Sequence, residues 1–272
     1  MSPGAAGSST TMRALLLPGL DGTGQLFAPL LPALPRAWDV EVVAYPSDDP
    51  LGYDALERLV RQRFRGEDSV VIAESFSGPL GIRLAAAPPP GLRALVLVAT
   101  FSRCPVPRLL ARLAARLAGV LPTVPPAIGV RMLLTGRGHP ELAEGVRAAM
   151  ATLSPAVVRA RLEAIAGVDV RSELSQAQVP VLALCATRDR LVPTRALAGL
   201  PHAAVARRIP GPHLLLQAAP KTCVEVMMKE APARASLQHD DPLPSHIQPE
   251  HLVDPVPVDV PCGDIDDRLP SR

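Results

Sequence analysis

Three side chains of this 272-residue chain have the types and the order of a serine nucleophile, an orienting acid and a general base. The first is Ser75, which lies in VVIAESFSGPLGIRLAA, where an apolar run changes to a helical pattern. A serine on such a sharp turn needs small residues two positions before and after it, and Ala73 and Ser77 meet that need. The turn would expose the Ser75 hydroxyl and aim the Phe76 N–H at a developing oxyanion. The alternative is a surface serine in an ordinary turn.

A serine hydroxyl is a poor nucleophile until a base removes its proton. His213, in IPGPHLLLQAAP, follows the last strand-like run, and the other two histidines before residue 231 are His139 and His202. The candidate acid is Asp189, in ALCATRDRLVP, directly after another apolar run. A packed histidine and a turn-forming or helix-capping aspartate would each be ordinary structural features. The order Ser, Asp, His, each after a separate strand, favours a catalytic triad.

A second donor to the oxyanion is expected in LLLPGLDGTG, the loop after the first apolar run. The backbone N–H of Leu20 could point to the same oxyanion as the Phe76 N–H. We expect Asp21 to hold this loop by accepting backbone hydrogen bonds rather than to take part in catalysis. Gly19, Gly22 and Gly24 have the spacing G-x-x-G-x-G, which is not the dinucleotide-binding fingerprint.

Short apolar runs and longer helical patterns alternate along the chain and would position these residues. The expected strands are 13–19, 40–46, 69–74, 93–100, 180–187 and 203–211. The expected helices between them are 23–34, 52–65, 77–88, 193–200 and 212–229. Four of the runs are almost continuously apolar, as in central strands that helices cover on both faces. The pattern predicts an α/β protein with a mostly parallel, doubly wound sheet.

The expected domain organisation has a core, an insertion and two flanking segments. Residues 101–179 contain no convincing strand, and amphipathic stretches at 107–118, 140–150 and 155–167 predict an inserted helical cap. The core is then 13–100 together with 180–230. Residues 1–12 are expected to be a flexible N-terminus. The last segment, 231–272, has eight prolines and a net charge of −5, and we expect it to be a disordered acidic tail.

The composition excludes several classes of function. The chain has 28 basic and 26 acidic residues, a formal net charge of +2, which gives no reason to propose a nucleic-acid partner. No cofactor motif or metal-ligand cluster is recognisable, so neither a cofactor nor a metal is expected. There is no secretory signal pattern and no apolar stretch of the roughly 20 residues that a membrane span needs. The chain is therefore expected to be cytoplasmic.

Four segments together resemble the α/β-hydrolase superfamily, in its group of small bacterial esterase-like serine hydrolases: LPGLDGTGQLFAPL, AESFSGP, ATRDRLVP and PGPH. The resemblance covers about residues 13–230 and implies the α/β-hydrolase fold with an inserted helical cap. It implies Ser75 as the nucleophile, His213 as general base and acid, Asp189 as the orienting acid, and the Leu20 and Phe76 amides as the oxyanion hole.

This chain departs from the family pattern at three places. Ala73 and Ser77 replace both glycines of the usual G-x-S-x-G, Pro18-Gly19 stands where many members have His-Gly, and the acidic tail has no counterpart in the family. The nucleophile of the family's dehalogenase branch is an aspartate, so Ser75 argues against that branch.

The resemblance implies hydrolysis of a small-molecule carboxylic ester through an acyl-enzyme on Ser75. Three alternatives stay open: a thioesterase or acyl-carrier-protein ester hydrolase, another acyl-transfer or C–C hydrolase, and a non-catalytic α/β-hydrolase-like binding protein. One feature bears on the acyl-carrier-protein alternative. The segment RLLARLAARLAGVL has an arginine every four residues, at Arg108, Arg112 and Arg116. They could attract an acidic acyl carrier protein, or they could be an ordinary solvated face. We expect the leucines of this helix, Leu109, Leu110, Leu113 and Leu117, to pack downward.

Overall fold

The computed structural model describes residues 12–118, 124–136, 138–197, 199–201 and 204–230. The tail predicted at 231–272 and all but the last residue of the N-terminus predicted at 1–12 lie outside the described residues. The division of the chain into a core, an inserted cap and two flanking segments stays a prediction.

Six parallel strands form one sheet, in the spatial order β2-β1-β3-β4-β5-β6. Each lies within or close to one of the six predicted runs, and the predicted fold class is confirmed. The strands are β1 (Arg13–Leu17), β2 (Asp39–Val42), β3 (Ser69–Glu74), β4 (Leu92–Val98), β5 (Val181–Ala186) and β6 (Val205–Ile209).

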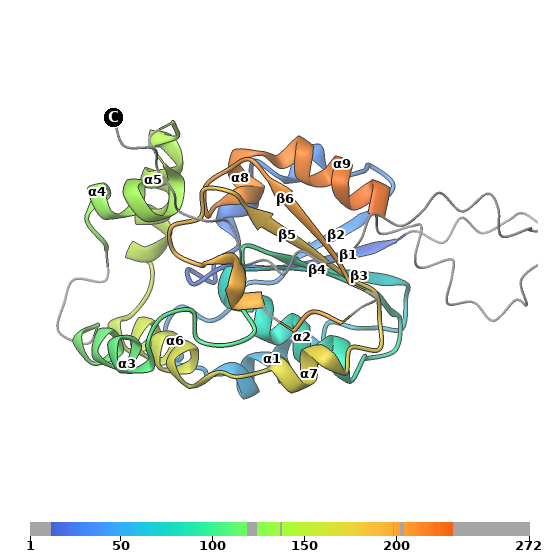
Figure 1. Cartoon of the computed structure of the whole chain (residues 1–272), viewed down its shortest axis with the longest axis horizontal. Coiled ribbons are helices and arrows are strands. Elements are labelled where there is room, and N and C mark those ends of the chain that lie inside the picture. The colour runs from blue at the N-terminus through green and yellow to red at the C-terminus, as the bar shows by residue number, and fades with distance from the viewer. Residues whose placement is uncertain (1–11, 119–123, 137, 198, 202–203, 231–272) are drawn as a thin grey trace, which may run out of the picture.

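The central strands are apolar on both faces because helices cover both faces of the sheet (Figure 1). Leu15 and Leu17 pack towards one face, in a cluster with residues of α1 (Tyr53–Arg61), α2 (Gly78–Ala86) and α7 (Arg171–Ser175). Ala14 and Leu16 alternate with them and pack towards α8 (Leu215–Ala218) and α9 (Pro220–Glu230). This alternation is the period of two that a strand imposes on its side chains.

Three of the predicted helices are shorter or broken, and proline accounts for two of the differences. The helix predicted at 23–34 is wrong: Gln25–Phe27 and Leu31–Ala33 form two 3-10 turns, because prolines at 29, 32 and 35 cannot donate the hydrogen bonds of a longer helix. The helix predicted at 212–229 is divided before Pro220 into α8 and α9. The one predicted at 193–200 is a 3-10 turn over Thr194–Leu197.

The described residues between β4 and β5 are mainly helical. They form α3 (Arg108–Leu117), α4 (Ala127–Val130), a π-helical turn over Arg131–Thr135, α5 (Pro140–Ala151), α6 (Pro155–Gly167) and α7. Figure 1 shows α3, α4, α5 and α6 together at the left-hand end of the sheet. By contrast, α7 packs against α2 in the layer that covers the sheet.

The predicted orientation of α3 is wrong. Its leucines are exposed, at 79% for Leu109, 59% for Leu110, 51% for Leu113 and 43% for Leu117. The buried residues are Ala111 and Ala115, and α3 packs against α6. Two small residues on one side of a helix let a neighbouring helix approach closely, and here that contact, rather than the leucine stripe, orients α3.

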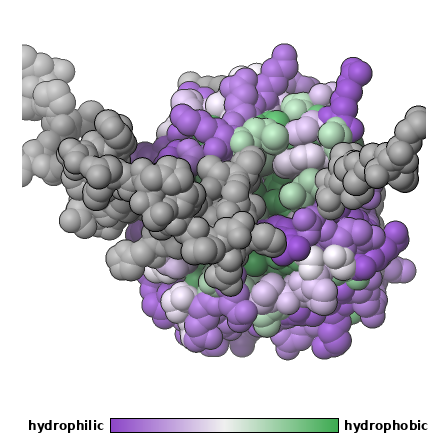
Figure 2. Space-filling model, turned by 90° about the vertical axis from the view of Figure 1, so that its right-hand side faces the viewer, coloured by the Kyte–Doolittle hydropathy of each residue, from purple (hydrophilic) through white to green (hydrophobic). Residues whose placement is uncertain are grey.

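Figure 2 shows the end of the molecule that lies on the right in Figure 1, away from α3 and α6. Its surface is largely hydrophilic at the rim, with apolar side chains towards the centre. Among the described residues, no helix combines the length and the apolarity that crossing a lipid bilayer requires.

Candidate active site

Ser75 lies on a strained turn between β3 and α2. Its φ is +49°, in the left-handed region that side chains other than glycine rarely adopt. Two hydrogen bonds to the backbone hold this turn: Thr100 Oγ1 donates to the Ser75 carbonyl, and Tyr53 Oη donates to the Phe76 carbonyl at 2.9 Å. Gly78 begins α2 directly under Thr100, where a Cβ would overlap the Thr100 side chain. The strain persists because the surroundings over-determine the backbone there.

The structure brings the three predicted residues of the triad together. Ser75 Oγ lies 2.9 Å from His213 Nε2, and His213 Nδ1 lies 2.7 Å from Asp189 Oδ2. The His213 and Asp189 side chains are 3% and 4% exposed. Each residue follows a different parallel strand, β3, β5 or β6, so that all three loops meet at one edge of the sheet.

The Asp189 carboxylate that contacts the imidazole is itself held by the backbone. Its Oδ1 accepts hydrogen bonds from the backbone N–H groups of Leu191 and Val192, both at 2.8 Å, which fixes the carboxylate. An ionised carboxylate only accepts hydrogen bonds, so Nδ1 of His213 carries the proton and Nε2 presents its lone pair to the Ser75 hydroxyl. This arrangement allows the imidazole to take the proton of Ser75.

The loop after β1 approaches Ser75 closely, as an oxyanion donor requires. A Cβ added at Gly19 would lie 4.0 Å from the Ser75 Cβ. The Leu20 N–H donates no hydrogen bond to another residue that the structure describes. The Phe76 N–H belongs to the first turn after β3, where helical N–H groups have no partner within the helix. Both predicted donors are thus near the nucleophile.

The same loop is fixed by buried polar contacts. Asp21 Oδ2 accepts from the Thr23 N–H at 2.9 Å and from its hydroxyl at 2.6 Å, which is the loop-holding role predicted for Asp21. Tyr45 Oη lies 2.7 Å from Ser77 Oγ, and Ser77 in turn donates to the Pro18 carbonyl. Ser77 is therefore fully buried and engaged, which separates it from the exposed edge where Ser75 lies.

Arg161 is a functional candidate that sequence reasoning missed. It is 2% exposed and reaches from α6 to the loop after β1, where Nη1 donates to the carbonyls of Leu20 and Asp21 at 2.8 Å each. Its Nη2 donates to the Pro46 carbonyl at 2.9 Å, and its guanidinium lies 5.9 Å from the centre of the Tyr45 ring. All three acceptors are backbone carbonyls. Every residue has one, so the residue types in the sequence cannot show which of them Arg161 contacts.

Among the described residues, the one other histidine does not join this group. His139 lies beside Glu141 at 3.5 Å, at the start of α5, and His202 lies outside the described residues. Within the described part of the chain, no three His, Cys, Asp or Glu side chains gather as a metal site would need.

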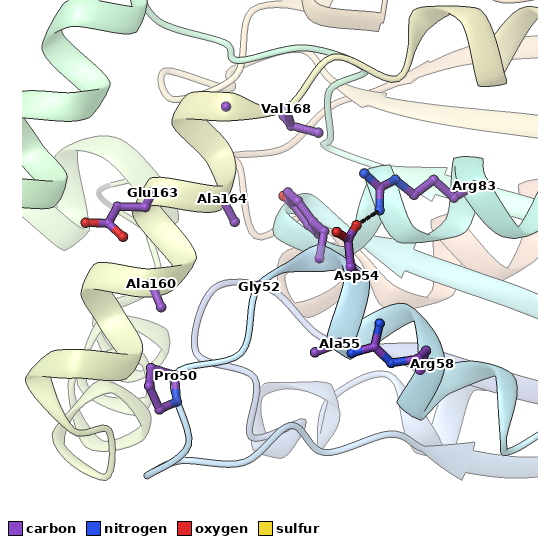
Figure 3. Close-up of a pocket in the computed structure, with 12 residues that line it drawn as sticks. Pro50, Gly52, Asp54, Ala55, Arg58, Arg83, Ala160, Glu163, Ala164 and Val168 are labelled. Atoms are coloured by element: carbon purple, nitrogen blue, oxygen red, sulfur yellow. Dashed lines mark hydrogen bonds and ion pairs between the residues drawn. The ribbon is translucent and has the colours of Figure 1, made fainter.

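A cavity of about 620 Å³ lies elsewhere, between α1 and α6. Figure 3 shows Asp54 and Arg83 pointing towards one another on one side of it, with Ala160 and Ala164 of α6 on the other. None of the three triad residues lines this cavity.

Comparison with known proteins places the fold. No protein-family model matches the chain, and no curated protein matches it in sequence. Solved structures do match. An enol-lactonase from Burkholderia xenovorans LB400 is 18% identical, with a TM-score of 0.65 over 80% of this chain and 90% of that chain. A hydrolase from Oleispira antarctica is 14% identical, with a TM-score of 0.70 over 80% and 90% of the two chains.

A third example is a bromoperoxidase from Bacillus anthracis, which is 15% identical, with a TM-score of 0.65 over 81% of this chain and 91% of that chain. The different activities in these names indicate that the shared fold does not fix the reaction. The chain has the α/β-hydrolase fold.

Proposed function

We propose that this protein is a serine hydrolase that cleaves carboxylic esters through an acyl-enzyme on Ser75. The observation that carries this proposal is the hydrogen-bonded series of Ser75, His213 and Asp189 at the carboxyl edge of the sheet. The fold supports it, and one structural relative is named as a lactonase, an enzyme class whose substrates are cyclic esters.

The mechanism follows from the roles of these groups. Nε2 of His213 takes the proton of Ser75 as the hydroxyl oxygen attacks the acyl carbonyl, and the new oxyanion accepts hydrogen bonds from the Leu20 and Phe76 amides. His213 then protonates the leaving alcohol as the C–O bond breaks. Water attacks the acyl-enzyme with His213 again as the base, and the acid is released with the Ser75 hydroxyl restored.

The inserted helices would act as a cap. Arg161 of α6 binds the Leu20 carbonyl, so the insertion is joined to the loop that supplies an oxyanion donor. We infer that α6 holds this loop in its working position.

An active-site probe tests the proposal directly. A fluorophosphonate should label the wild type but not Ser75→Ala, because the probe forms a bond only with an activated serine. Ser77→Ala is the matched control and should still be labelled, since Ser77 is buried and bonded to Pro18 and Tyr45. Labelling that persists in Ser75→Ala would contradict the assignment of the nucleophile.

A second candidate function is hydrolysis of thioesters or of esters on an acyl carrier protein. The observation that favours it is the exposed row of Arg108, Arg112 and Arg116 on α3. A turnover screen with p-nitrophenyl esters and thioesters of graded chain length, with Ser75→Ala as the blank, separates the two. Binding of the same esters with no turnover would instead support a non-catalytic binding protein.

A further inference from the structure

A buried acid lies directly beside the proposed nucleophile and is not used in the mechanism above. Glu74 is the last residue of β3 and is 2% exposed. Its Oε2 accepts a hydrogen bond from Nε2 of Gln217 at 3.1 Å. Gln217 belongs to α8, four residues after His213, and is itself 5% exposed. The contact therefore joins the turn that carries Ser75 to the helix that follows His213.

Each member of this pair keeps one buried oxygen without a partner in the described structure. These atoms are Oε1 of Glu74 and Oε1 of Gln217. An ionised carboxylate has no donor to offer, so both buried oxygens would stay without a hydrogen bond, which is unfavourable. A proton on Oε1 of Glu74 changes this, because the protonated Oε1 can donate a hydrogen bond to Oε1 of Gln217.

The charges around Glu74 favour its neutral form. Burial raises the pKa of Glu74 to about 8, the hydrogen bond from Gln217 lowers it, and the charge of Asp21 raises it. Cys223 of α9 also lies near the acid, and burial raises the pKa of its thiol, so that this neighbour is neutral as well. Neither Asp21 nor Cys223 offers a positive charge that would stabilise a carboxylate.

We propose that Glu74 is a positioning residue that acts as a neutral carboxylic acid, paired with the Gln217 amide through two hydrogen bonds, and so fixes α8 and His213 against the Ser75 turn. This proposal rests on the proposed function for its effect on catalysis. The acid–amide pair itself rests only on the contact, the burial and the two unpartnered oxygens.

Thermal unfolding tests the protonation of Glu74 without any assay of activity. The unfolded acid loses its proton near pH 4.5, and the folded acid keeps it up to about pH 8. Between these values the folded state binds one more proton, so stability falls as pH rises, and above about pH 8 the loss is complete. The Tm of the wild type should fall across this range relative to that of Glu74→Gln, which cannot titrate. Parallel Tm curves would overturn the proposal.

Kinetics test the positioning role. Glu74→Gln can still form two hydrogen bonds with Gln217, so kcat should stay within about twofold of wild type below pH 8 and should lack the alkaline decline of the wild type. Gln217→Leu should lower kcat about tenfold with KM unchanged, because it disturbs the Ser75–His213 geometry rather than substrate binding. The exchanged pair Glu74→Gln with Gln217→Glu keeps one acid and one amide at this contact, so its kcat should also stay close to that of the wild type.

The outcomes separate the two proposals. If the wild type hydrolyses no ester and takes no fluorophosphonate label but shows the Tm difference, the proposed function fails and the acid–amide pair stands. If the enzyme is active and Glu74→Gln has the alkaline decline of the wild type, the positioning role fails and the proposed function stands. A Gln217→Leu variant that keeps full kcat also overturns the positioning role.

Discussion

At the scale of the residue, the geometry of the site depends on Ser75 having a positive φ. With this backbone conformation, the Ser75 hydroxyl lies 2.9 Å from Nε2 of His213. Thr100 and Tyr53 bond to the carbonyls on either side of the turn and keep it in place. The orientation of the Ser75 side chain depends on these two contacts with the backbone.

Because Ser75, His213 and Asp189 would act as a unit, removing a second member should add little to the loss caused by the first. Ser75→Ala and His213→Ala should each lower kcat by several orders of magnitude, and the double variant should be about as active as either single one. Steady-state kinetics on a p-nitrophenyl ester measure this. Losses that multiply in the double variant would show that the two residues act independently.

The sequence predicted that Ser75, Asp189 and His213 would meet, because each follows an apolar run and has a side chain of recognisable chemistry, and the structure brings them together. Sequence reasoning gave Glu74 and Arg161 no role, because burial and partners decide what they do. The partners of Arg161 are backbone carbonyls, and the partner of Glu74 is an amide 143 residues away. Residue types and their spacing along the sequence cannot predict such contacts.

At the scale of the element, α6 is fixed to the core by a buried charge. Arg161→Gln takes the guanidinium away from three carbonyls and should lower the free energy of unfolding by about 1–3 kcal/mol for each carbonyl left without a donor. Arg159→Gln on the same helix is the matched control, since its exposed pair with Glu163 is worth less than about 1 kcal/mol. Urea unfolding of both variants measures the difference, and equal losses would remove the special role of Arg161.

The strands were easier to predict than the helices, for a physical reason. A strand that helices cover on both faces has apolar side chains at almost every position, so it can be recognised as an apolar run. β1, β3 and β5 are such strands. The helical pattern of α3 was misleading because its leucines are exposed and its alanines are buried. Which face of a helix packs inward depends on its neighbour, and α6 lies far along the chain from α3.

At the scale of the whole molecule, charge is distributed unevenly. Residues 1–230 have a net charge of +7, and Arg108, Arg112 and Arg116 are all exposed on α3. If they attract an acidic acyl carrier protein, replacing all three with glutamine should lower kcat/KM for that substrate at low ionic strength and much less at high ionic strength.

The same triple variant should leave kcat/KM for a small neutral ester unchanged at either ionic strength. If the triple variant changes kcat/KM equally for both substrates, and salt makes no difference, the three arginines do not attract an acyl carrier protein. That result would favour a carboxylesterase that acts on small esters.

The hydrogen bond between Ser75 and His213 joins residues 138 positions apart. Between them the chain must complete β4, the inserted helices, β5 and β6. Contacts of such long range form slowly, because the intervening chain must lose its freedom before they become favourable. On a ribosome Ser75 is synthesised long before His213, because 138 positions separate them. In refolding from denaturant, secondary structure should return first and the capacity to react with a fluorophosphonate should return last.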